Sequence, residues 1–418
     1  MKMLKYAEPS SIFVVVTPFE GTCFGALLEV KLEEEGSATH KTQPVLETVS
    51  QFTTKDLGRG MWKFCTLDSM LYILPDGGPD LFDTEVCFPK CSGHIFNIET
   101  RKVVTSTKSP APKWFGTHVS AYGKIYSLSD PYSSRDLPEP SFEQYDPITQ
   151  SWQELCSFPY SDEYGKTQIQ GYAVCAEILL FSICGCKDNY GALWAYDVIK
   201  NKWRPVQVDN IGCYFRGRAV VSDKTIYALS IFPMVVVAFS ITSNQNEEGH
   251  ISYSTGSLLQ FDFPLFIGWR SDQHLVHLGN LVFYLIQSGF DDEPDVRQPV
   301  SITKFQIVGG REINVISSTL CEVDLGDMGP FDVQSCFTVS SSWFPHTVYA
   351  GEWEDVPEEV NAWEAVTLTE EAIASKEVTL AEEDIVYVRK IGRYINLGKQ
   401  FPELPQAIPV PYQAGIDP

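Results

Sequence analysis

Two eight-residue segments about fifty residues apart follow nearly the same pattern: Tyr145-Asp146-Pro147-Ile148-Thr149-Gln150-Ser151-Trp152 and Tyr196-Asp197-Val198-Ile199-Lys200-Asn201-Lys202-Trp203. The Asp that follows the Tyr can bond the local backbone, as a tight turn between two strands requires. The closing Trp is large enough to fill the space between one twisted sheet and the next. A repeat of about fifty residues with this content predicts a series of small antiparallel sheets, with the Trp as a packing residue.

Five segments share one plan, in which two apolar runs flank a short turn, and this is the pattern of a β-hairpin. They are Met61 to Leu74, Thr117 to Leu128, Tyr172 to Ile183, Ala219 to Leu229 and Leu275 to Ile286. Each is followed by an outer pair of strands, at 94–104, 142–152, 193–203, 258–263 and 302–317. In this scheme the region from Phe232 to Gly256 is a long insertion between strands. Because few segments show helical periodicity, the sequence predicts an all-β protein.

A sixth unit can be assembled from both ends of the chain. It would join Ser11 to Val16 and Phe24 to Leu32 with Ser335 to Ser341 and, as a candidate addition, Thr347 to Trp353. Such closure removes exposed sheet edges. The sequence therefore predicts a six-bladed β-propeller over residues 10–353, closed by N- and C-terminal strands, with seven blades as the alternative. The acidic and proline-rich extension over 354–418 is expected to be a solvated tail with a short docked element at Ile385 to Val388.

The composition excludes several classes of partner. The chain has 418 residues and a formal net charge of −23, and so acidic a protein repels nucleic-acid phosphates. No apolar run approaches the roughly 20 residues that span a bilayer, and an acidic surface also disfavours anionic membranes. The chain has 11 cysteines without a disulfide framework pattern. This odd number favours a reducing compartment, so we expect a cytoplasmic or nuclear protein.

The Tyr-Asp to Trp spacing, the period and the run Asp76-Gly77-Gly78 make the chain resemble kelch-repeat, galactose-oxidase-like β-propellers over about residues 10–353. The glycine doublet typical of that family survives clearly only at Gly77-Gly78. The divergence resembles that of plant kelch proteins, including those attached to an F-box, although no F-box-like or BTB-like helical segment is visible. The resemblance implies a rigid scaffold that binds a partner at the mouth of a central channel. As an adaptor, the chain would need another subunit to bring the effector.

The resemblance also implies where a ligand would bind. In kelch propellers that bind ligands, residues just before each inner strand surround one mouth of the channel. The matching positions are Arg59, Trp114, Gln170, Arg216, Arg218, Asp272 and His274. A guanidinium group can bind a carboxylate through two parallel hydrogen bonds, and an aromatic residue offers a flat apolar wall. The alternative for each residue is an ordinary loop side chain that bonds a neighbouring carbonyl group.

No catalytic or metal signature is present in the sequence. Cys213-Tyr214 and the scattered His residues do not reproduce the Tyr, Cys and His copper site of galactose oxidase, and the spaced Glu, Asp and His of iron-binding nitrile-specifier kelch proteins are missing. Two close cysteine pairs lack the second half of the four-ligand set that structural zinc needs; these are Cys87 with Cys91 and Cys184 with Cys186. We therefore expect no metal and no cofactor.

The sequence thus favours a kelch-type binding module that recognises a protein or peptide partner at the channel mouth. The alternative is a metal-independent enzyme or small-molecule-binding protein of plant specialised metabolism that uses the same pocket. In that alternative His274 with Asp272 would relay a proton, and Arg216 or Arg218 would stabilise an anion. A deep closed pocket would favour the enzyme, whereas an open ring with exposed aromatic residues would favour protein recognition.

Overall fold

The protein is described by a computed structural model, which covers residues 11–18, 25–31, 46–52, 61–76, 92–107, 113, 116–130, 139–160, 167–185, 191–209, 213–231, 235–245, 251–261, 272–289, 297–325 and 331–339. Within these residues the chain forms 25 strands. None of these residues belongs to a helix long and apolar enough to cross a membrane. The fold is all-β, as the turn and hairpin patterns predict.

The strands fall into six groups, of which four are separate four-stranded sheets and two are joined in a nine-stranded sheet. Group 1 is β25-β1-β2-β3 (Phe331–Thr338, Ser11–Pro18, Gly25–Lys31, Leu46–Phe52), and group 2 is β4-β5-β6-β7 (Met61–Leu67, Met70–Asp76, Gly93–Asn97, Lys102–Thr107). Group 3 is β8-β9-β10-β11 (Thr117–Ala121, Lys124–Leu128, Phe142–Asp146, Ser151–Glu154), and group 4 is β12-β13-β14-β15 (Thr167–Cys175, Ile178–Gly185, Gly191–Asp197, Lys202–Gln207).

Group 5 consists of β16 to β20 (Phe215–Ser222, Thr225–Ser230, Val236–Gln245, Ile251–Thr255, Leu259–Phe261), and group 6 is β21-β22-β23-β24 (Asp272–His277, Val282–Ser288, Arg297–Val308, Glu312–Asp324). Neighbouring strands within a group pair antiparallel. Groups 4 and 5 form one sheet because two parallel pairs, β12 with β16 and β15 with β19, connect them.

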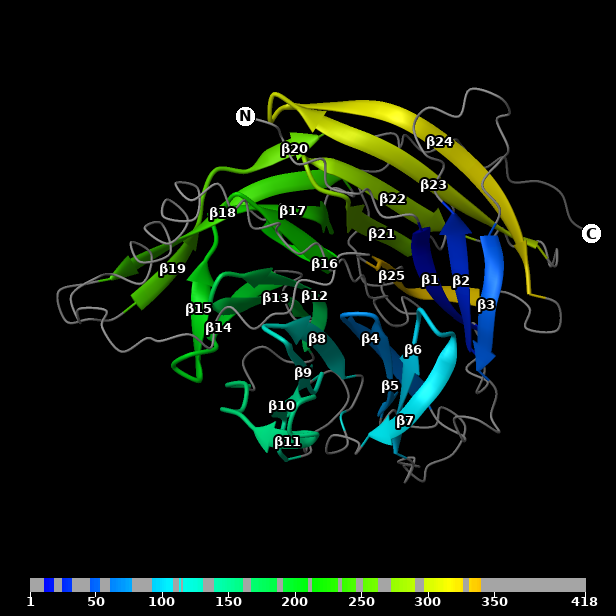
Figure 1. Ribbon diagram of the computed structural model, residues 1–418. Coiled ribbons are helices and arrows are strands. Elements are labelled where there is room, and N and C mark those ends of the chain that lie inside the picture. Colours follow the sequence, from blue (N-terminus) through cyan, green and yellow to red (C-terminus); the bar gives the residue numbers. More distant parts are fainter. Residues whose placement is uncertain are drawn as a thin grey trace, which may run out of the picture.

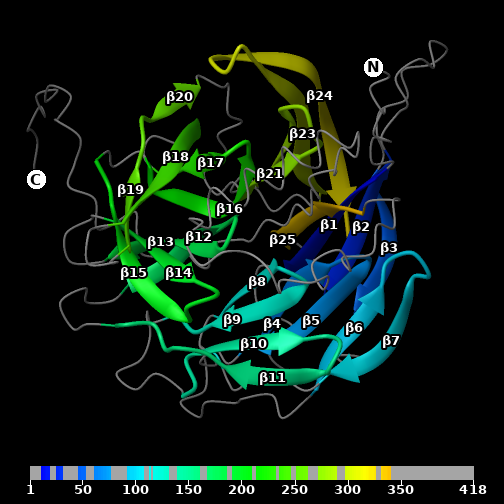
Figure 2. The same ribbon diagram turned by 60° about the vertical axis from the view of Figure 1, so that its left-hand side comes forward.

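The innermost strands of the six groups form a closed ring (Figures 1 and 2). β25 contacts β4, β4 contacts β8, β8 contacts β12, β12 contacts β16, β16 contacts β21, and β21 contacts β25 again. Each of these strands lies at one end of its sheet order, or, for β12 and β16, at the junction of the two joined groups. The result is a propeller-like arrangement in which the sheets surround a common centre.

All five predicted inner hairpins are confirmed, as β4 with β5, β8 with β9, β12 with β13, β16 with β17 and β21 with β22. The predicted closure is also confirmed, because β25 pairs with β1 and opposes Phe337 to Phe13. β3 was not anticipated in the sequence. The interpretation of 232–256 as an insertion is wrong, since β18 and β19 both lie there and β18 is the third strand of group 5. Residues 77–78, 347–353 and the extension 354–418 lie outside the described residues.

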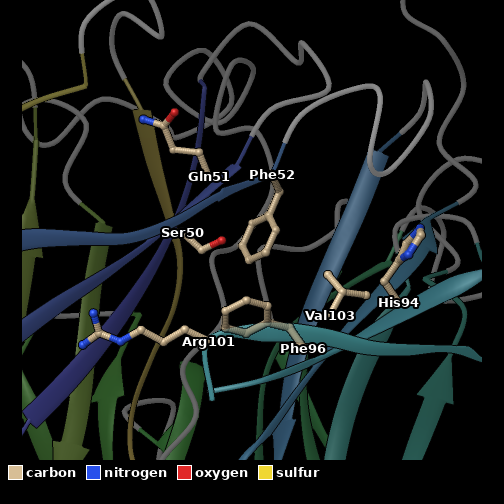
Figure 3. Close-up of a pocket in the computed structure, with 7 residues that line it drawn as sticks. All are labelled: Ser50, Gln51, Phe52, His94, Phe96, Arg101 and Val103. Carbon is tan, nitrogen blue, oxygen red and sulfur yellow. The ribbon is translucent and has the colours of Figure 1, made fainter. Parts of the chain in front are cut away.

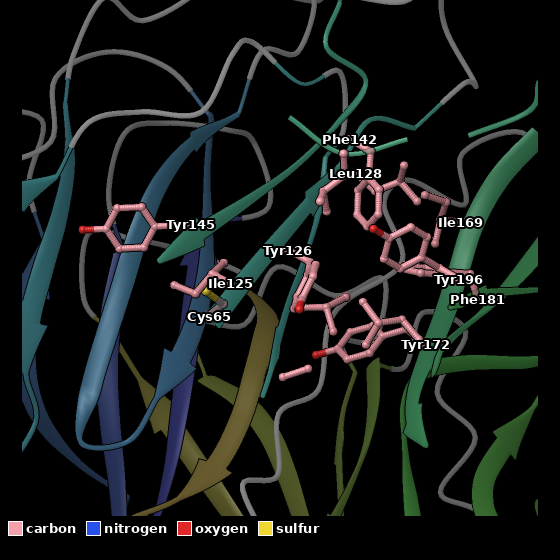
Figure 4. Close-up of a cluster of buried hydrophobic side chains, with 14 of the residues drawn as sticks. Cys65, Ile125, Tyr126, Leu128, Phe142, Tyr145, Ile169, Tyr172, Phe181 and Tyr196 are labelled. Atoms are coloured by element: carbon pink, nitrogen blue, oxygen red, sulfur yellow. The ribbon is translucent and has the colours of Figure 1, made fainter. Parts of the chain in front are cut away.

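The core consists of buried side chains between successive groups. One cluster joins groups 2, 3 and 4 through aromatic residues and includes Tyr126, Phe142, Tyr145, Tyr172 and Tyr196 (Figure 4). Trp152 and Trp203 pack against the same cluster, so their predicted role in packing is confirmed. The large rings therefore fix the spacing between neighbouring sheets.

Candidate functional site

The five described residues of the predicted site lie on three neighbouring inner strands. Gln170 is on β12, Arg216 and Arg218 are on β16, and Asp272 and His274 are on β21. Because β12 contacts β16 and β16 contacts β21, the structure brings these residues to one sector of the ring. The other two, Arg59 and Trp114, lie outside the described residues.

A close approach of two backbones positions the first part of this sector. Gly171 on β12 pairs with Gly217 on β16, and a Cβ atom added at Gly171 would lie 2.5 Å from the Gly217 carbonyl oxygen. Gly217 has a φ of 66°, a left-handed conformation that favours glycine. At the same place the β16–β17 ladder is irregular between Arg216 and Val220. This bulge lets β16 pair with β12 instead, with Arg218 opposite Tyr172.

Arg216 is the buried cation of the site. It is 8% exposed, and its guanidinium donates a short hydrogen bond to the Gln273 side-chain oxygen of β21. Its Nε atom is buried and has no hydrogen-bond partner in the described part of the chain. Arg216 also forms no ion pair with a described carboxylate. A buried charge without an acidic partner is unusual, because burial of an unpaired ion is costly.

Asp272 and His274 both bind the backbone of the closing strand. The Asp272 carboxylate accepts a hydrogen bond from the Val333 N–H group at 3.0 Å, and His274 Nε2 lies 3.1 Å from the Val333 carbonyl oxygen, to which it donates. Nearby, the Gln298 amide bonds both the N–H and the C=O of Phe331, at 2.8 and 2.9 Å. These contacts assign His274 and Asp272 a structural role at the junction of groups 6 and 1.

Gln170 is buried, and its amide donates to the Gln168 side-chain oxygen at 3.0 Å. Gln273, the partner of Arg216, was missed in the sequence although it lies between two predicted site residues. The sequence signal was its position between Asp272 and His274 at the start of an inner strand. Such a residue is normally bonded across the ring.

The described residues hold no group of three or more His, Cys, Asp or Glu side chains that could hold a metal ion. Seven of their cysteines are free thiols, and burial raises the pKa of Cys175 to about 12. Cys213 is buried, and burial raises its pKa as well. Cys87, Cys91 and Cys186 lie outside the described ranges.

A pocket of about 360 Å³ lies away from this sector, between groups 1 and 2. It is lined by Ser50, Gln51, Phe52, His94, Phe96, Arg101 and Val103 (Figure 3). In this view the rings of Phe52 and Phe96 lie between Arg101 and Val103. Its lining residues come from β3, from β6 and β7, and from the turn between β6 and β7.

Comparisons with known proteins show likeness in fold only. No protein-family model matches the chain, and no curated protein matches its sequence. The solved structure of YjhT is 12% identical, with a TM-score of 0.36 over 75% of this chain and 96% of its own. A protein from Lactobacillus plantarum is 10% identical, with a TM-score of 0.42, and the match covers 79% of this chain and 92% of that protein. TolB from Acinetobacter baumannii is 14% identical, with a TM-score of 0.38, and the match covers 75% of this chain and 67% of TolB. At these values no residue role or activity is transferred to this chain.

Proposed function

We propose that the chain is a six-bladed β-propeller of kelch type and acts as a binding module, which recognises an acidic group of a protein or peptide partner at the sector of the ring marked by Arg216. The closed ring of inner strands β25, β4, β8, β12, β16 and β21 supports the proposal of six blades. The kelch assignment, a plant-type protein and a cytoplasmic or nuclear location remain predictions from the sequence.

The proposal rests on the Arg216 guanidinium, which is buried without an acidic partner among the described residues. It is held by Gln273, it is 8% exposed, and no described carboxylate neutralises it. A carboxylate from a partner would supply two parallel hydrogen bonds and compensate the buried charge. Gln273 is a suitable support because its neutral side chain orients the guanidinium without neutralising the positive charge.

The alternative function, an enzyme that relays a proton through His274 and Asp272, has less support. Each of these side chains bonds the backbone of Val333, which fixes it for the closure of the ring. A general base must instead present its atom to a substrate. The proposal of a binding module uses Arg216 without requiring either residue to react.

The test is the selection of linear peptides from a displayed random library by the full chain, followed by fluorescence anisotropy of the recovered peptides. We expect selected peptides to share an acidic residue and Arg216→Gln to weaken their binding about tenfold or more, since a hydrogen bond to a charged group contributes about 1.5–3 kcal/mol. Arg216→Lys should bind the peptides with intermediate affinity, because lysine keeps the positive charge but cannot form the bidentate pair of hydrogen bonds.

Arg311→Gln is the matched control, since it makes the same change in net charge at an exposed turn between β23 and β24. Thermal unfolding of each variant separates lost recognition from lost stability. Selected peptides without a common acidic residue, or equal affinity of the wild-type chain and Arg216→Gln, would reject the proposal. Untargeted mass spectrometry of molecules released from the purified chain on denaturation tests for a bound metabolite, which would support the enzyme instead.

A further inference from the structure

The turn between β6 and β7 is a third copy of the repeated segment, with Val103 in the place of the Trp. The Asn97 side-chain oxygen accepts the Thr100 N–H group at 2.7 Å, as Asp197 accepts that of Lys200 at 2.8 Å. Arg101 has a φ of 56°, close to the 50° of Asn201. These positions match residue by residue, so group 2 has the same turn without the large ring.

Phe96 is opposite Val103 in the ladder, just as Tyr145 is opposite Trp152 and Tyr196 is opposite Trp203. In group 4 the Trp203 ring reaches the preceding group and lies 5.1 Å from the ring of Phe142. In group 2 the preceding group is group 1, where the ring of Phe52 on β3 meets that of Phe96.

The pocket between groups 1 and 2 lies at the place that the missing indole would occupy. Val103 is 55% exposed and lines the pocket together with Phe96 and with Ser50, Gln51 and Phe52 of β3 (Figure 3). Val is much smaller than Trp, and the described side chains around it have not closed the space. At the position of the repeated Trp, the site between groups 1 and 2 therefore has no indole, and the space beside Val103 can take an aromatic ring.

The chemistry of the lining fits an indole. The Phe52 and Phe96 rings meet edge to face at 5.5 Å and provide an apolar wall. Ser50 and Gln51 each have a side-chain oxygen that can accept an indole N–H group, a role that the Cys156 carbonyl performs for Trp203 at 2.8 Å. Arg101 is held at 2.8 Å by Glu29 and presents a planar cation on which a ring can stack.

The strands beside the pocket favour a peptide as the source of the ring. β3 and β7 are each at the outer end of their sheet, so among the described strands each pairs on one side only. An extended peptide can add to such an edge through main-chain hydrogen bonds while a side chain enters a pocket. Arg101 is already paired with Glu29, but Lys102 is exposed and residues 101–107 contain no acid, so an acidic residue of the peptide beside Lys102 is complementary to this edge.

We propose that this pocket is a second binding site, which accepts a tryptophan side chain from an extended acidic segment of a partner protein while the segment's backbone pairs with the edge of β7. The site is separate from the sector marked by Arg216. Binding at one can therefore be lost while binding at the other is kept.

The test uses an acetylated seven-residue acidic peptide with one central tryptophan, labelled with a fluorophore, and measures its anisotropy with the full chain. We expect the dissociation constant to rise about tenfold or more when Ala replaces the peptide's tryptophan, as for an aromatic hot-spot residue. Val103→Trp should weaken binding by a similar factor, because the chain then fills its own pocket. The same variant should melt at a higher temperature than the wild-type chain.

Val104→Trp is the matched control, since Val104 is also 55% exposed and does not line the pocket; it should change affinity less than about threefold. If Val103→Trp does not fold, Val103→Phe provides the same test. No binding at millimolar peptide, or equal binding by Val103→Trp, would overturn the proposal. If N-acetyltryptophanamide alone binds as tightly as the peptide, the ligand is a free indole compound and the assignment to a partner protein is wrong.

Discussion

At the scale of single residues, the repeated segment does more than make a turn. Asn201 accepts two hydrogen bonds at its side-chain oxygen, from the Cys156 N–H group at 2.7 Å and from the Tyr196 hydroxyl at 2.8 Å. The Trp203 indole donates to the Cys156 carbonyl at 2.8 Å. The turn of group 4 thus holds the segment that leaves group 3. The same residues that shape the turn therefore also join two groups.

Trp203→Ala should lower the free energy of unfolding by about 3–5 kcal/mol, as large-to-small core substitutions do. The ring lies within 5.3 Å of those of Phe142, Phe158, Phe181 and Tyr196. Trp152→Ala should also destabilise the fold, because Trp152 packs against the same buried cluster and its ring lies 5.2 Å from that of Tyr145. Trp203→Phe keeps an aromatic ring but removes the indole hydrogen bond to Cys156, so it should lower the free energy of unfolding by about 1 kcal/mol from that bond. Urea unfolding measures all three, and an unchanged free energy of unfolding for Trp203→Ala or Trp152→Ala would contradict this account.

At the scale of elements, neighbouring groups are joined by a side chain of one and the backbone of the next. The Asp76 carboxylate, at the end of β5, accepts the Gly116 N–H group at 2.9 Å. The Asp130 carboxylate accepts a hydrogen bond from the Ile169 N–H group at 3.3 Å, and the Ser182 hydroxyl accepts one from the Phe215 N–H group at 3.0 Å. Asp272 repeats the arrangement with Val333 at the closure. Such bonds satisfy buried inner-strand N–H groups where no adjacent ladder does so.

Gly171→Ala tests the closest junction, between β12 and β16. The new methyl group would lie 2.5 Å from the Gly217 carbonyl oxygen and 2.9 Å from that of Phe215, so a backbone must move. We expect a loss of about 1–3 kcal/mol in the free energy of unfolding, as for other overpacked sites. Gly25→Ala on β2 is the control, because its nearest atom would be 3.4 Å away. Chemical denaturation should show no loss for that control; a loss as large as that of Gly171→Ala would refute the steric explanation.

At the scale of the whole molecule, the closure has a mechanical consequence. β25 from the end of the described chain pairs with β1 from its beginning, so each inner strand contacts one inner strand on either side. Opening any junction then exposes the apolar side chains of two groups. A closed ring of this kind should unfold as one unit, since no group has a free outer face from which to separate.

Pulse alkylation with iodoacetamide at rising urea concentration tests this cooperativity. Cys65 on β4, Cys175 on β12 and Cys336 on β25 are buried thiols, and burial raises the pKa of each, so few are in the reactive thiolate form when folded. We expect Cys156, which is exposed, to react first, and the other three to become reactive at one common urea midpoint. Mass spectrometry of the labelled peptides reports each site. An earlier midpoint for Cys336 would mean that the ring opens at its closure.

By itself, the sequence determined the all-β class, the five inner hairpins and the packing role of Trp152 and Trp203. Those features depend on residues close together in the chain, such as an Asp that bonds an N–H group two or three residues later. Only the tertiary structure decided that β18 and β19 replace the expected insertion, because β18 divides its pairing among β17, β19 and β20, and β19 also pairs with β15 of group 4. It likewise decided that Gln273 supports Arg216 and that His274 holds Val333. Contacts between side chains far apart in sequence leave no periodic signal in it.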